Sequence, residues 1–417
     1  MYCMAKDRYI AGIDIGTHSV RVVQAKLNAE EDKLAVIGAV SVPAAGLRRG
    51  VVTDLDEAVS ALSTALEKLE RMTAVPVSEA VVSVSGQHIV SLTSKGVIAV
   101  SKADGEVSEA DIVRVVDAAQ AVSIPPNREV LHVIPKAFML DGQEGIKDPL
   151  GMSGVRLEVD TTMVHGSSSL LKNLQRVCSQ AGVSARELVV TPLAAAQAVL
   201  SRKQKELGVV VVDIGAGTTS IAVYEENTLL HTAVLPLGGL HITNDLAIGL
   251  RTSIDTAERV KILYGYAGSL PIGEQQAIDL SKIDENESES VARADVVDII
   301  EARLSEIFEH VNRELKAINR DGQLPAGVVL VGGTSNMPGI VQYAKQALRL
   351  PAQVGVLQGL TTIIDKVEDP SFAVVCGLVM WSHTYGGQGY GAGSAAGKLL
   401  EHPVAQKAIR WFKSFLP

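Results

Sequence analysis

One short pattern occurs twice in the chain, and this repeat constrains the fold more than any other feature. Each copy is an apolar strand that ends in Asp-Ile-Gly, followed by a turn containing Thr or Ser and by a second strand. The copies span residues 9–23, with Asp14, and 208–224, with Asp213. A third strand and a helix follow each copy, so the repeated unit is strand-strand-strand-helix. The repeat predicts two related α/β units with facing hairpins.

The glycines of the second copy predict an anion site. At Gly215 and Gly217 the backbone can come close to a ligand, and successive N–H groups can surround an anion. The neighbouring carboxylate of Asp213 would repel a phosphate unless a cation lay between them. The combination indicates a nucleotide phosphate with Mg²⁺. By itself the signal is weak, because glycine-rich turns between strands are common.

A third glycine-rich turn follows the apolar strand 327–331. It reads Gly332-Gly333-Thr334-Ser335, and Pro338 after it suits the start of a helix. In order and spacing, the three turns resemble the first phosphate, second phosphate and adenosine motifs of the superfamily that contains actin, DnaK-type chaperones and sugar kinases. The resemblance implies an α/β, actin-like fold of two lobes with ATP in the cleft between them.

Composition limits the alternatives. The chain has 417 residues, enough for several domains, and its net charge of -9 argues against a general nucleic-acid partner. The three cysteines show neither paired nor metal-ligand spacing, which fits a reducing compartment. No apolar run reaches the roughly 20 residues of a spanning helix, and charges interrupt the early apolar run where a signal peptide would lie. We therefore expect a soluble, cytoplasmic protein, unless something anchors it from outside the bilayer.

Residues 84–163 interrupt the repeat. This segment has three strand-like pieces and a helix at 109–122 that Ser108 can cap, but no glycine-rich phosphate turn. A structural insertion and a protein-contact domain both fit the pattern. Before the segment, residues 54–72 are expected to form an amphipathic helix.

Three further motifs indicate one family within this superfamily. His-Val-Ile-Pro at 132–135 and the stretches at 143–149 and 151–157 resemble the FtsA family of bacterial cell-division proteins. The likeness extends over nearly the whole chain. In that family an inserted subdomain, called 1C, replaces the usual subdomain 1B of the actin-like body.

The resemblance implies a domain plan. The predicted parts are subdomain 1A (1–83, 164–201 and 370–383), subdomain 1C (84–163), subdomain 2A (202–240 and 310–369), subdomain 2B (241–309), a flexible linker (384–400) and an amphipathic membrane-targeting helix (401–417).

The resemblance also implies roles in binding ATP. Asp14 and Asp213 would hold Mg²⁺ through its water molecules. The phosphate-binding residues would be Gly16, Thr17, His18, Gly215, Gly217, Thr218 and Thr219. The adenosine-binding residues would be Gly239, Glu258, Lys261, Gly332, Gly333 and Ser335. Without the resemblance, Glu258 and Lys261 would be interpreted as a solvated ion pair on one helix face.

Two further residues have competing interpretations. Gln197 lies before the second phosphate strand, where actin has a glutamine that orients the attacking water; the alternative is a helix glutamine at a domain seam. Arg303 lies off the apolar stripe of a long helix at 296–318. By resemblance this helix belongs to the site that binds the C-terminal tail of FtsZ, whereas the alternative is an ordinary surface charge.

The end of the chain changes character. A glycine-rich stretch from residue 383 to 397 predicts a flexible linker. The following helix has an apolar arc, three cations and no acidic residue after Glu401, a pattern typical of a helix that lies in the membrane interface. Docking of this helix on its own body is the alternative. The expected membrane-binding residues are Lys407, Arg410, Trp411, Phe412, Lys413, Phe415 and Leu416.

The residues themselves predict a nucleotide clamp, a flexible tether and an amphipathic tail. The resemblance implies an ATP-binding adaptor that tethers FtsZ filaments to the inner face of the cytoplasmic membrane at the division site, polymerises with itself and recruits other division proteins through subdomain 1C. Because Gln197 is the only candidate to orient water and no base is recognisable, we expect ATP hydrolysis to be slow at most. A small-molecule kinase is one alternative, although no general base faces an acceptor pocket. A pilus-assembly ATPase is another, but it should lack the tethered tail.

Overall fold

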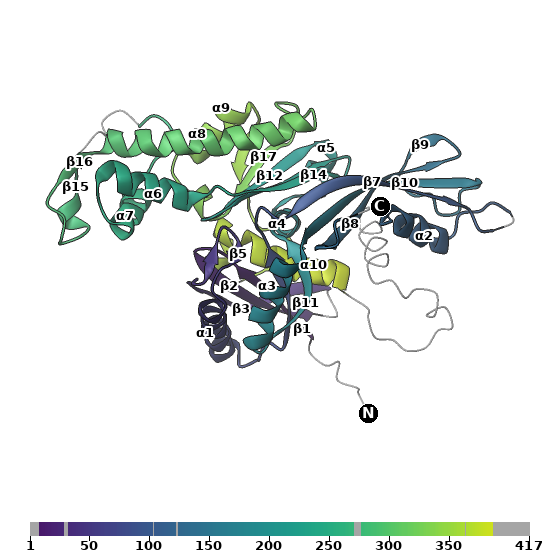
Figure 1. The fold of residues 1–417 in the computed structure, drawn as a ribbon, viewed down its shortest axis with the longest axis horizontal. Coiled ribbons are helices and arrows are strands. Elements are labelled where there is room, and N and C mark those ends of the chain that lie inside the picture. The colour runs from purple at the N-terminus through teal and green to yellow at the C-terminus, as the bar shows by residue number, and fades with distance from the viewer. Residues whose placement is uncertain are drawn as a thin grey trace.

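The computed structural model describes residues 8–28, 32–102, 104–121, 124–270, 277–362 and 364–386. The predicted linker beyond residue 386 and the predicted membrane-targeting helix lie outside these ranges. The described residues build two lobes and an inserted domain around three larger sheets (Figure 1). The expected actin-like α/β class is confirmed by the two related lobe sheets and by the structural comparisons below.

The first lobe is built on a six-stranded sheet. Its strands, in sheet order, are β11 (Ser184–Val190), β6 (Glu79–Val84), β1 (Arg8–Ile15), β2 (Ser19–Asn28), β3 (Lys33–Pro43) and β19 (Leu360–Thr361). Helices α1 (Leu55–Thr73) and α3 (Ser168–Gln180) pack together beside this sheet. The predicted helix at 54–72 is confirmed as α1, and the Asp54 side chain caps it by accepting from the N–H of Glu57.

The second lobe repeats the strand plan in a five-stranded sheet. Its strands are β14 (Thr228–Leu235), β13 (Thr219–Glu225), β12 (Val209–Ile214), β17 (Gly327–Val331) and β18 (Ala352–Val354). In both lobes the first three strands pair antiparallel, so the predicted repeat is confirmed. The four valines of β12 are fully buried because alternate side chains enter two different cores: Val209 and Val211 face the first lobe, and Val210 and Val212 face the helices of the second.

Helices of the second lobe extend away from its sheet. They are α5 (Arg202–Leu207), α6 (Gly239–Leu250), α7 (Ile254–Tyr264), α8 (Arg293–Ala317) and α9 (Ile340–Leu348), with the small hairpin β15 (Ala277–Asp279) and β16 (Ser290–Ala292). Short 3-10 turns are η1 (Leu280–Lys282), η2 (Gly333–Asn336), η3 (Asp365–Glu368) and η4 (Pro370–Phe372). Pro338 lies just before α9 and not within it, because η2 and a turn separate the helix from β17.

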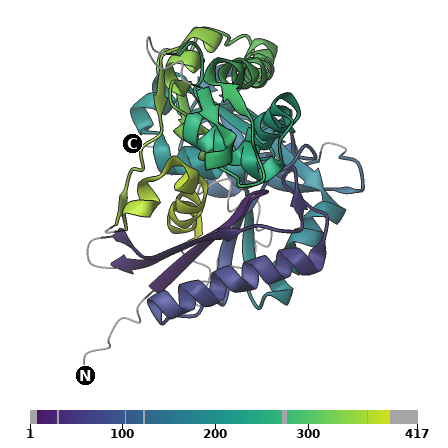
Figure 2. The same cartoon turned by 90° about the vertical axis from the view of Figure 1, so that its left-hand side faces the viewer.

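Two helices occupy the space between the lobes. They are α4 (Thr191–Val199) and α10 (Ala373–Gly386). Figure 2 shows the yellow α10 between the purple strands of the first lobe and the green helices of the second. A Cβ added at Gly377 of α10 would lie 1.8 Å from the carbonyl oxygen of Ala194 in α4, so only glycine permits this close helix packing.

The inserted domain has its own small core. Its antiparallel sheet runs β7 (Val90–Ala99), β10 (Arg156–Ser167), β8 (Arg128–Leu140) and β9 (Gln143–Ile146), and α2 (Glu109–Ala119) packs on it. The predicted cap of α2 is confirmed, because Ser108 and Asp111 form a capping box. The domain extends alongside the second-lobe sheet, on the side away from α6–α8 (Figure 1). There the hydroxyls of Ser91 and Thr162 donate to the β14 carbonyls of Thr232 and Leu229, at 2.8 and 3.1 Å.

Two strands of the structure, β11 and β9, were not predicted from the sequence. Strand β11, which no apolar alternation in the sequence predicts, lies between α3 and α4. Its Leu188-Val189-Val190 run pairs in parallel with β6, because β-branched side chains suit a buried strand. The short β9 was not predicted either, since its polar sequence lacks an apolar alternation.

Candidate functional site

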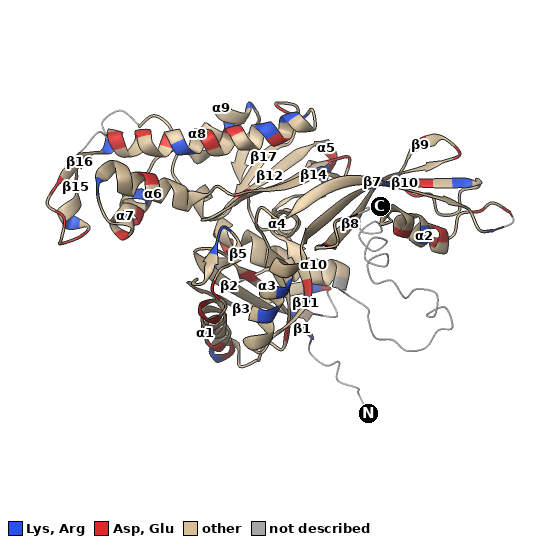
Figure 3. Cartoon of the chain, in the orientation of Figure 1, with Lys and Arg blue, Asp and Glu red and all other residues tan. Residues whose placement is uncertain are grey.

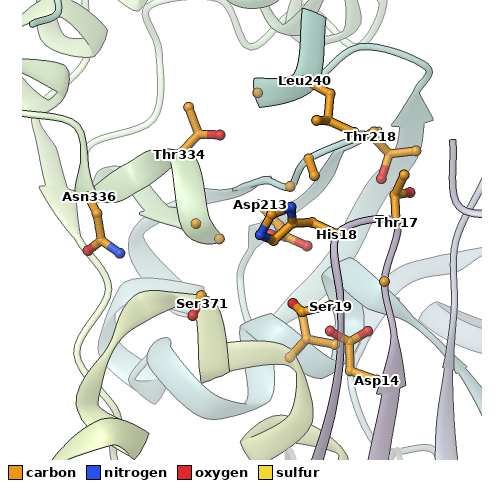
Figure 4. A pocket seen from close by; sticks show the side chains of 18 of the residues that line it. Asp14, Thr17, His18, Ser19, Asp213, Thr218, Leu240, Thr334, Asn336 and Ser371 are labelled. Atoms are coloured by element: carbon orange, nitrogen blue, oxygen red, sulfur yellow. The ribbon is translucent and has the colours of Figure 1, made fainter. Parts of the chain in front are cut away.

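A cavity of about 480 Å³ lies between the lobes, and both repeated hairpins contribute to its walls. Figure 4 shows Thr17 and Thr218 together on one side of this cavity, and Thr334 and Asn336 on the other. The structure brings most of the predicted nucleotide residues to this one place. These lining residues are Asp14, Gly16, Thr17, His18, Asp213, Gly215, Gly217, Thr218, Gly239, Glu258, Lys261, Gly332 and Gly333.

Three predicted residues do not line the cavity. The buried Thr219 donates its hydroxyl to the carbonyl of Leu237 at 2.9 Å, and Ser335 donates to the carbonyl of Val331 at 2.5 Å. Both hydroxyls therefore hold the protein's own backbone. Gln197 donates its amide to the Thr384 hydroxyl of α10 at 3.2 Å, as expected for a helix glutamine at a domain seam.

Helix α4 reaches the cavity with its first residue instead. Thr191 lines the wall, and its hydroxyl donates to the carbonyl of Val84 at 2.9 Å. Gln197 lies six residues further along, which places it roughly 9 Å from Thr191 along the helix axis. Gln197 therefore does not reach the cavity wall, where a residue that orients the attacking water would have to lie.

Several lining residues were not predicted. Ser19 and Arg21 belong to the first hairpin and lie two residues apart, so strand alternation after the Asp14 turn could have identified them. Ile15, Ala216 and Thr334 lie within the three glycine-rich motifs, although no role was predicted for them. The others come from separate segments that the fold brings together. These are Gly50, Ser85, Thr191, Leu240, Ile262, Asn336, Met337, Pro338, Ser371 and Val374.

The two glycine turns have matching geometry. The N–H of Gly16 donates to the carbonyl of Ser19 at 3.1 Å, and the N–H of Gly215 donates to that of Thr218 at 2.9 Å. A Cβ at Gly217 would lie 2.7 Å from Oγ1 of Thr17. Gly217 is therefore required for the two turns to approach each other. The sequence had suggested only that the backbone comes close to a ligand at this position.

A second glycine is required at the third turn. Gly332 has φ +87°, and an added Cβ would lie 2.4 Å from Oδ1 of Asp213. The close approach places the third turn directly beside this carboxylate. At the next position, a Cβ added to Gly333 meets no atom within 4 Å, so Gly333 faces open space.

Two buried carboxylates dominate the electrostatics of the cavity. Asp14 accepts from the Ser83 hydroxyl at 2.6 Å and has the Arg21 guanidinium 3.9 Å away, yet burial raises its pKa. Burial, together with the negative charge of Asp14, raises the pKa of Asp213 to about 7. Repulsion between the two carboxylates is therefore only partly offset by one arginine.

This arrangement fits a hydrated Mg²⁺ bound to phosphate. Mg²⁺ keeps several waters and uses one or two carboxylates together with phosphate oxygens. No group of three His, Cys, Asp or Glu side chains able to hold a metal occurs among the described residues. The buried hydroxyl of Ser19, in the cavity wall, has no hydrogen-bond partner within the described structure and can serve a ligand.

The other end of the cavity carries a fixed ion pair. Lys261 and Glu258 of α7 are 2.6 Å apart and mostly buried, so they are not a solvated surface pair. Lys261 also donates to the Thr243 hydroxyl at 2.8 Å and to the carbonyl of Gly239 at 3.2 Å. These contacts tie α7 to the start of α6 and hold both charged groups beside the cavity.

Arg303 lies outside this cavity, on α8. Its guanidinium forms two hydrogen bonds with the Asp245 carboxylate of α6, at 2.6 and 3.0 Å, and also pairs with Glu306. Charged residues of both signs follow each other along α8 in Figure 3. Arg303 is thus half-buried and already paired, unlike an ordinary surface charge.

Comparisons with known proteins agree on one family. The family profile described as cell division protein FtsA matches residues 210–377, and the profile described as an SHS2 domain inserted in FtsA matches 86–165. Cell division protein FtsA of Pseudomonas aeruginosa is 36% identical over 91% of both chains. The Bacillus subtilis relative is 38% identical over 91% of this chain and 84% of its own, and the Escherichia coli relative is 30% identical over 98% and 97%.

Solved structures support the fold. A type IV pilus biogenesis complex, PilM-PilN, superposes with a TM-score of 0.63 at 18% identity, covering 89% of this chain and 97% of the other. MreB5 of Spiroplasma citri bound to ADP superposes with a TM-score of 0.54 at 14% identity, covering 90% and 97%. At such identities the likeness establishes the actin-like fold alone.

The buried carboxylates generate a stability prediction. Because the folded-state pKa of Asp213 is raised above its usual value, the folded protein binds more protons than the unfolded chain between about pH 4 and 7. The free energy of unfolding therefore falls as pH rises through this window. We expect Asp213→Asn to stabilise the protein at pH 8, without nucleotide or divalent cations, by on the order of 2–4 kcal/mol. Thermal melts at pH 5 and pH 8 measure the effect.

Asp369→Asn is the matched control. The carboxylate of Asp369 accepts from the N–H of Ser371 at 2.8 Å, and its pKa is lowered in spite of burial, chiefly by its hydrogen bonds with Ser371. Its replacement should destabilise the protein at pH 8. Equal melting temperatures for Asp213→Asn and the parent at pH 8 would show that no repulsion is stored at the acid pair.

Proposed function

The chain belongs to the FtsA family of cell division proteins, and we propose that it is an ATP- and Mg²⁺-binding adaptor that attaches FtsZ filaments to the inner face of the cytoplasmic membrane. The observation that carries the nucleotide part is the buried carboxylate pair between two matched glycine turns. Family membership sets aside the small-molecule kinase and the pilus-assembly ATPase.

The two glycine turns supply the phosphate contacts in this proposal. The amides of Gly16 and Gly215 donate within their own turns, so Thr17, Gly217 and Thr218 are the positions whose N–H groups would bind phosphate. Asp14 and Asp213 would hold Mg²⁺ through water, which neutralises negative charge on the phosphates and on the carboxylates together. Glu258 and Lys261 would contact the adenosine at the far end of the cavity.

Slow hydrolysis fits the same geometry. Positioning of the attacking water and neutralisation of charge account for most catalysis of phosphoryl transfer. Gln197, the residue predicted to orient water, bonds to α10 instead of lining the cavity. We therefore assign the nucleotide a mainly conformational role, with ATP turnover slow at most.

Partner binding is assigned to the surfaces outside the cleft. The inserted domain would contact other division proteins, and copies of the chain would polymerise with each other. A peptide from the FtsZ tail would bind near α8 of the second lobe, at Arg303. Because Asp245 and Glu306 already pair with this arginine, an acidic peptide would have to displace at least one of these carboxylates.

Membrane attachment is assigned to residues 401–417. No helix among the described residues is long and apolar enough to cross a membrane. Each basic residue near an anionic surface contributes about 1 kcal/mol, and burial of aromatic side chains in the interface adds several more. Ordering of the tail offsets part of this gain. A single tail should therefore bind weakly, and a row of tails on a polymer should bind tightly.

Gly333→Val tests the nucleotide assignment. Because a Cβ at this position meets no protein atom within 4 Å, the added isopropyl group should enter the cavity without disturbing the fold. We expect ATP affinity, measured by calorimetry with Mg²⁺, to fall at least about tenfold, since an overlapping side chain excludes the ligand. Gly333→Ala should have a smaller effect, and both variants should melt like the parent. Parental ATP affinity in Gly333→Val would contradict the assignment.

Arg303→Glu tests the peptide site. Reversal of this charge should weaken binding of an FtsZ-tail peptide about tenfold or more, because it removes a charge-assisted contact and adds repulsion. Arg320→Glu is the matched control, since Arg320 forms a similar pair with Glu225 at 2.7 Å near the end of the same lobe. Fluorescence anisotropy of a labelled peptide measures both. Equal losses in the two variants, or none in Arg303→Glu, would remove Arg303 from the site.

Trp411→Glu tests the membrane anchor. The substitution places a charge on the apolar arc, so the protein should no longer sediment with liposomes at any salt concentration. Lys413→Glu leaves that arc intact and should weaken binding chiefly on anionic lipid at low salt. If Trp411→Glu sediments as well as the parent does, residues 401–417 are not the anchor.

A further inference from the structure

A short hairpin of the first lobe reaches the end of the cavity where the two glycine turns meet. It consists of β4 (Leu47–Arg48) and β5 (Val51–Val52), with Arg49 and Gly50 as its turn. Gly50 lines the cavity, and its N–H donates to Oγ1 of Thr17 at 3.1 Å. The hairpin is therefore bonded to the first glycine turn.

The same hairpin touches the second glycine turn. A Cβ added at Gly217 would lie 3.1 Å from the Cα of Arg49, and 2.7 Å from Oγ1 of Thr17. Arg49 thus lies where turns from the two lobes converge, although sequence places it in neither glycine motif. Figure 1 shows β5 on the side of the first lobe that faces the second.

The backbone of Arg49 is unusual. Its φ is +50°, and Gly50 follows with φ +76°, as in a two-residue turn with both central residues left-handed. Asparagine, aspartate or glycine normally occupies the first of these positions, because a larger side chain is disfavoured there. Arg251 and Arg349 share this conformation, so the position of Arg49 beside the glycine turns, and not its φ alone, marks it as a candidate.

Arg49 is also a cation beside the glycine turns whose charge is not paired with another described residue. It is exposed, and no hydrogen bond or ion pair joins its guanidinium to another described residue. In contrast, Arg21 faces Asp14 at 3.9 Å and Lys261 pairs with Glu258 at 2.6 Å. The positive charge of Arg49 also acts on α6 of the second lobe, because the pKa of His241 is lowered mainly by burial and partly by Arg49.

We propose that Arg49 is a further phosphate-binding residue, which contacts the terminal phosphate of a nucleoside triphosphate and so distinguishes it from a diphosphate. The inference rests on the proposed binding of ATP in this cleft. The terminal phosphate is the relevant one because Arg49 lies beside the two glycine turns that would hold the phosphates, whereas the predicted adenosine contacts Glu258 and Lys261 belong to α7.

The contact also connects the nucleotide to the inserted domain. A Cβ at Gly50 would lie 3.0 Å from the backbone nitrogen of Gly86, at the entry to that domain. Next to it, the hydroxyls of Ser85 and Thr218 are 3.3 Å apart. A pull on Arg49 by a third phosphate would therefore act on a turn that packs against the start of the insertion.

Arg49→Gly tests the proposal without straining the turn. Glycine adopts the left-handed conformation readily, so the variant loses only the side chain. We expect ATP affinity with Mg²⁺ to fall about ten- to a hundredfold, as for the loss of a hydrogen bond between charged groups. ADP affinity should change less than about threefold, because the missing partner is the terminal phosphate. Arg49→Lys keeps the charge and should recover part of the ATP preference.

Arg251→Gly is the matched control. Arg251 is also exposed and left-handed, with φ +57°, but it ends α6, twelve residues and roughly 18 Å along the helix from Gly239, which lines the cavity. Its replacement should leave the affinities for ATP and ADP unchanged. An unaltered ratio of ATP to ADP affinity in Arg49→Gly, or equal losses for both nucleotides, would overturn the role of Arg49. A parent protein that binds neither nucleotide would instead overturn the proposed function.

Discussion

Repulsion between two buried carboxylates is the constraint on which the rest of the structure depends. Asp14 and Asp213 are the penultimate residues of β1 and β12, so the repeated strand plan brings one acid from each lobe to the same cavity. Burial makes this pair costly, as the raised pKa values of both groups indicate. A cation bound together with a polyphosphate would compensate the negative charge of the two carboxylates and so stabilise a ligand between the lobes.

Close backbone contacts let the lobes meet around this pair. Gly217 permits the second glycine turn to touch Thr17, Gly332 permits the third turn to reach Asp213, and Gly377 permits α10 to pack on α4. The inserted domain is joined to the first lobe by the continuous chain and to β14 of the second lobe by hydrogen bonds. It therefore contacts both lobes.

Local patterns predicted the parts of the fold that local physics determines. The repeat, the helix at 54–72 and the cap at Ser108 follow from strand alternation, helical periodicity and the unsatisfied amides of helix ends. Long-range geometry decided the rest. Gln197 matched a superfamily position but bonds to α10, and Arg49 lies outside every motif, yet folding places it between the two glycine turns. The pairing of Arg303 with Asp245 depends on how α6 and α8 pack, which no local pattern specifies.

The most direct test of this account is a calorimetric titration of the full chain with ATP, performed once with Mg²⁺ and once with a chelator of divalent cations. If the carboxylate pair organises the cleft, ATP binds tightly with Mg²⁺ and much more weakly without it, because phosphate then faces two uncompensated acids. Equal affinity in the two titrations would contradict the account, since phosphate binding would not require the cation that Asp14 and Asp213 are proposed to hold.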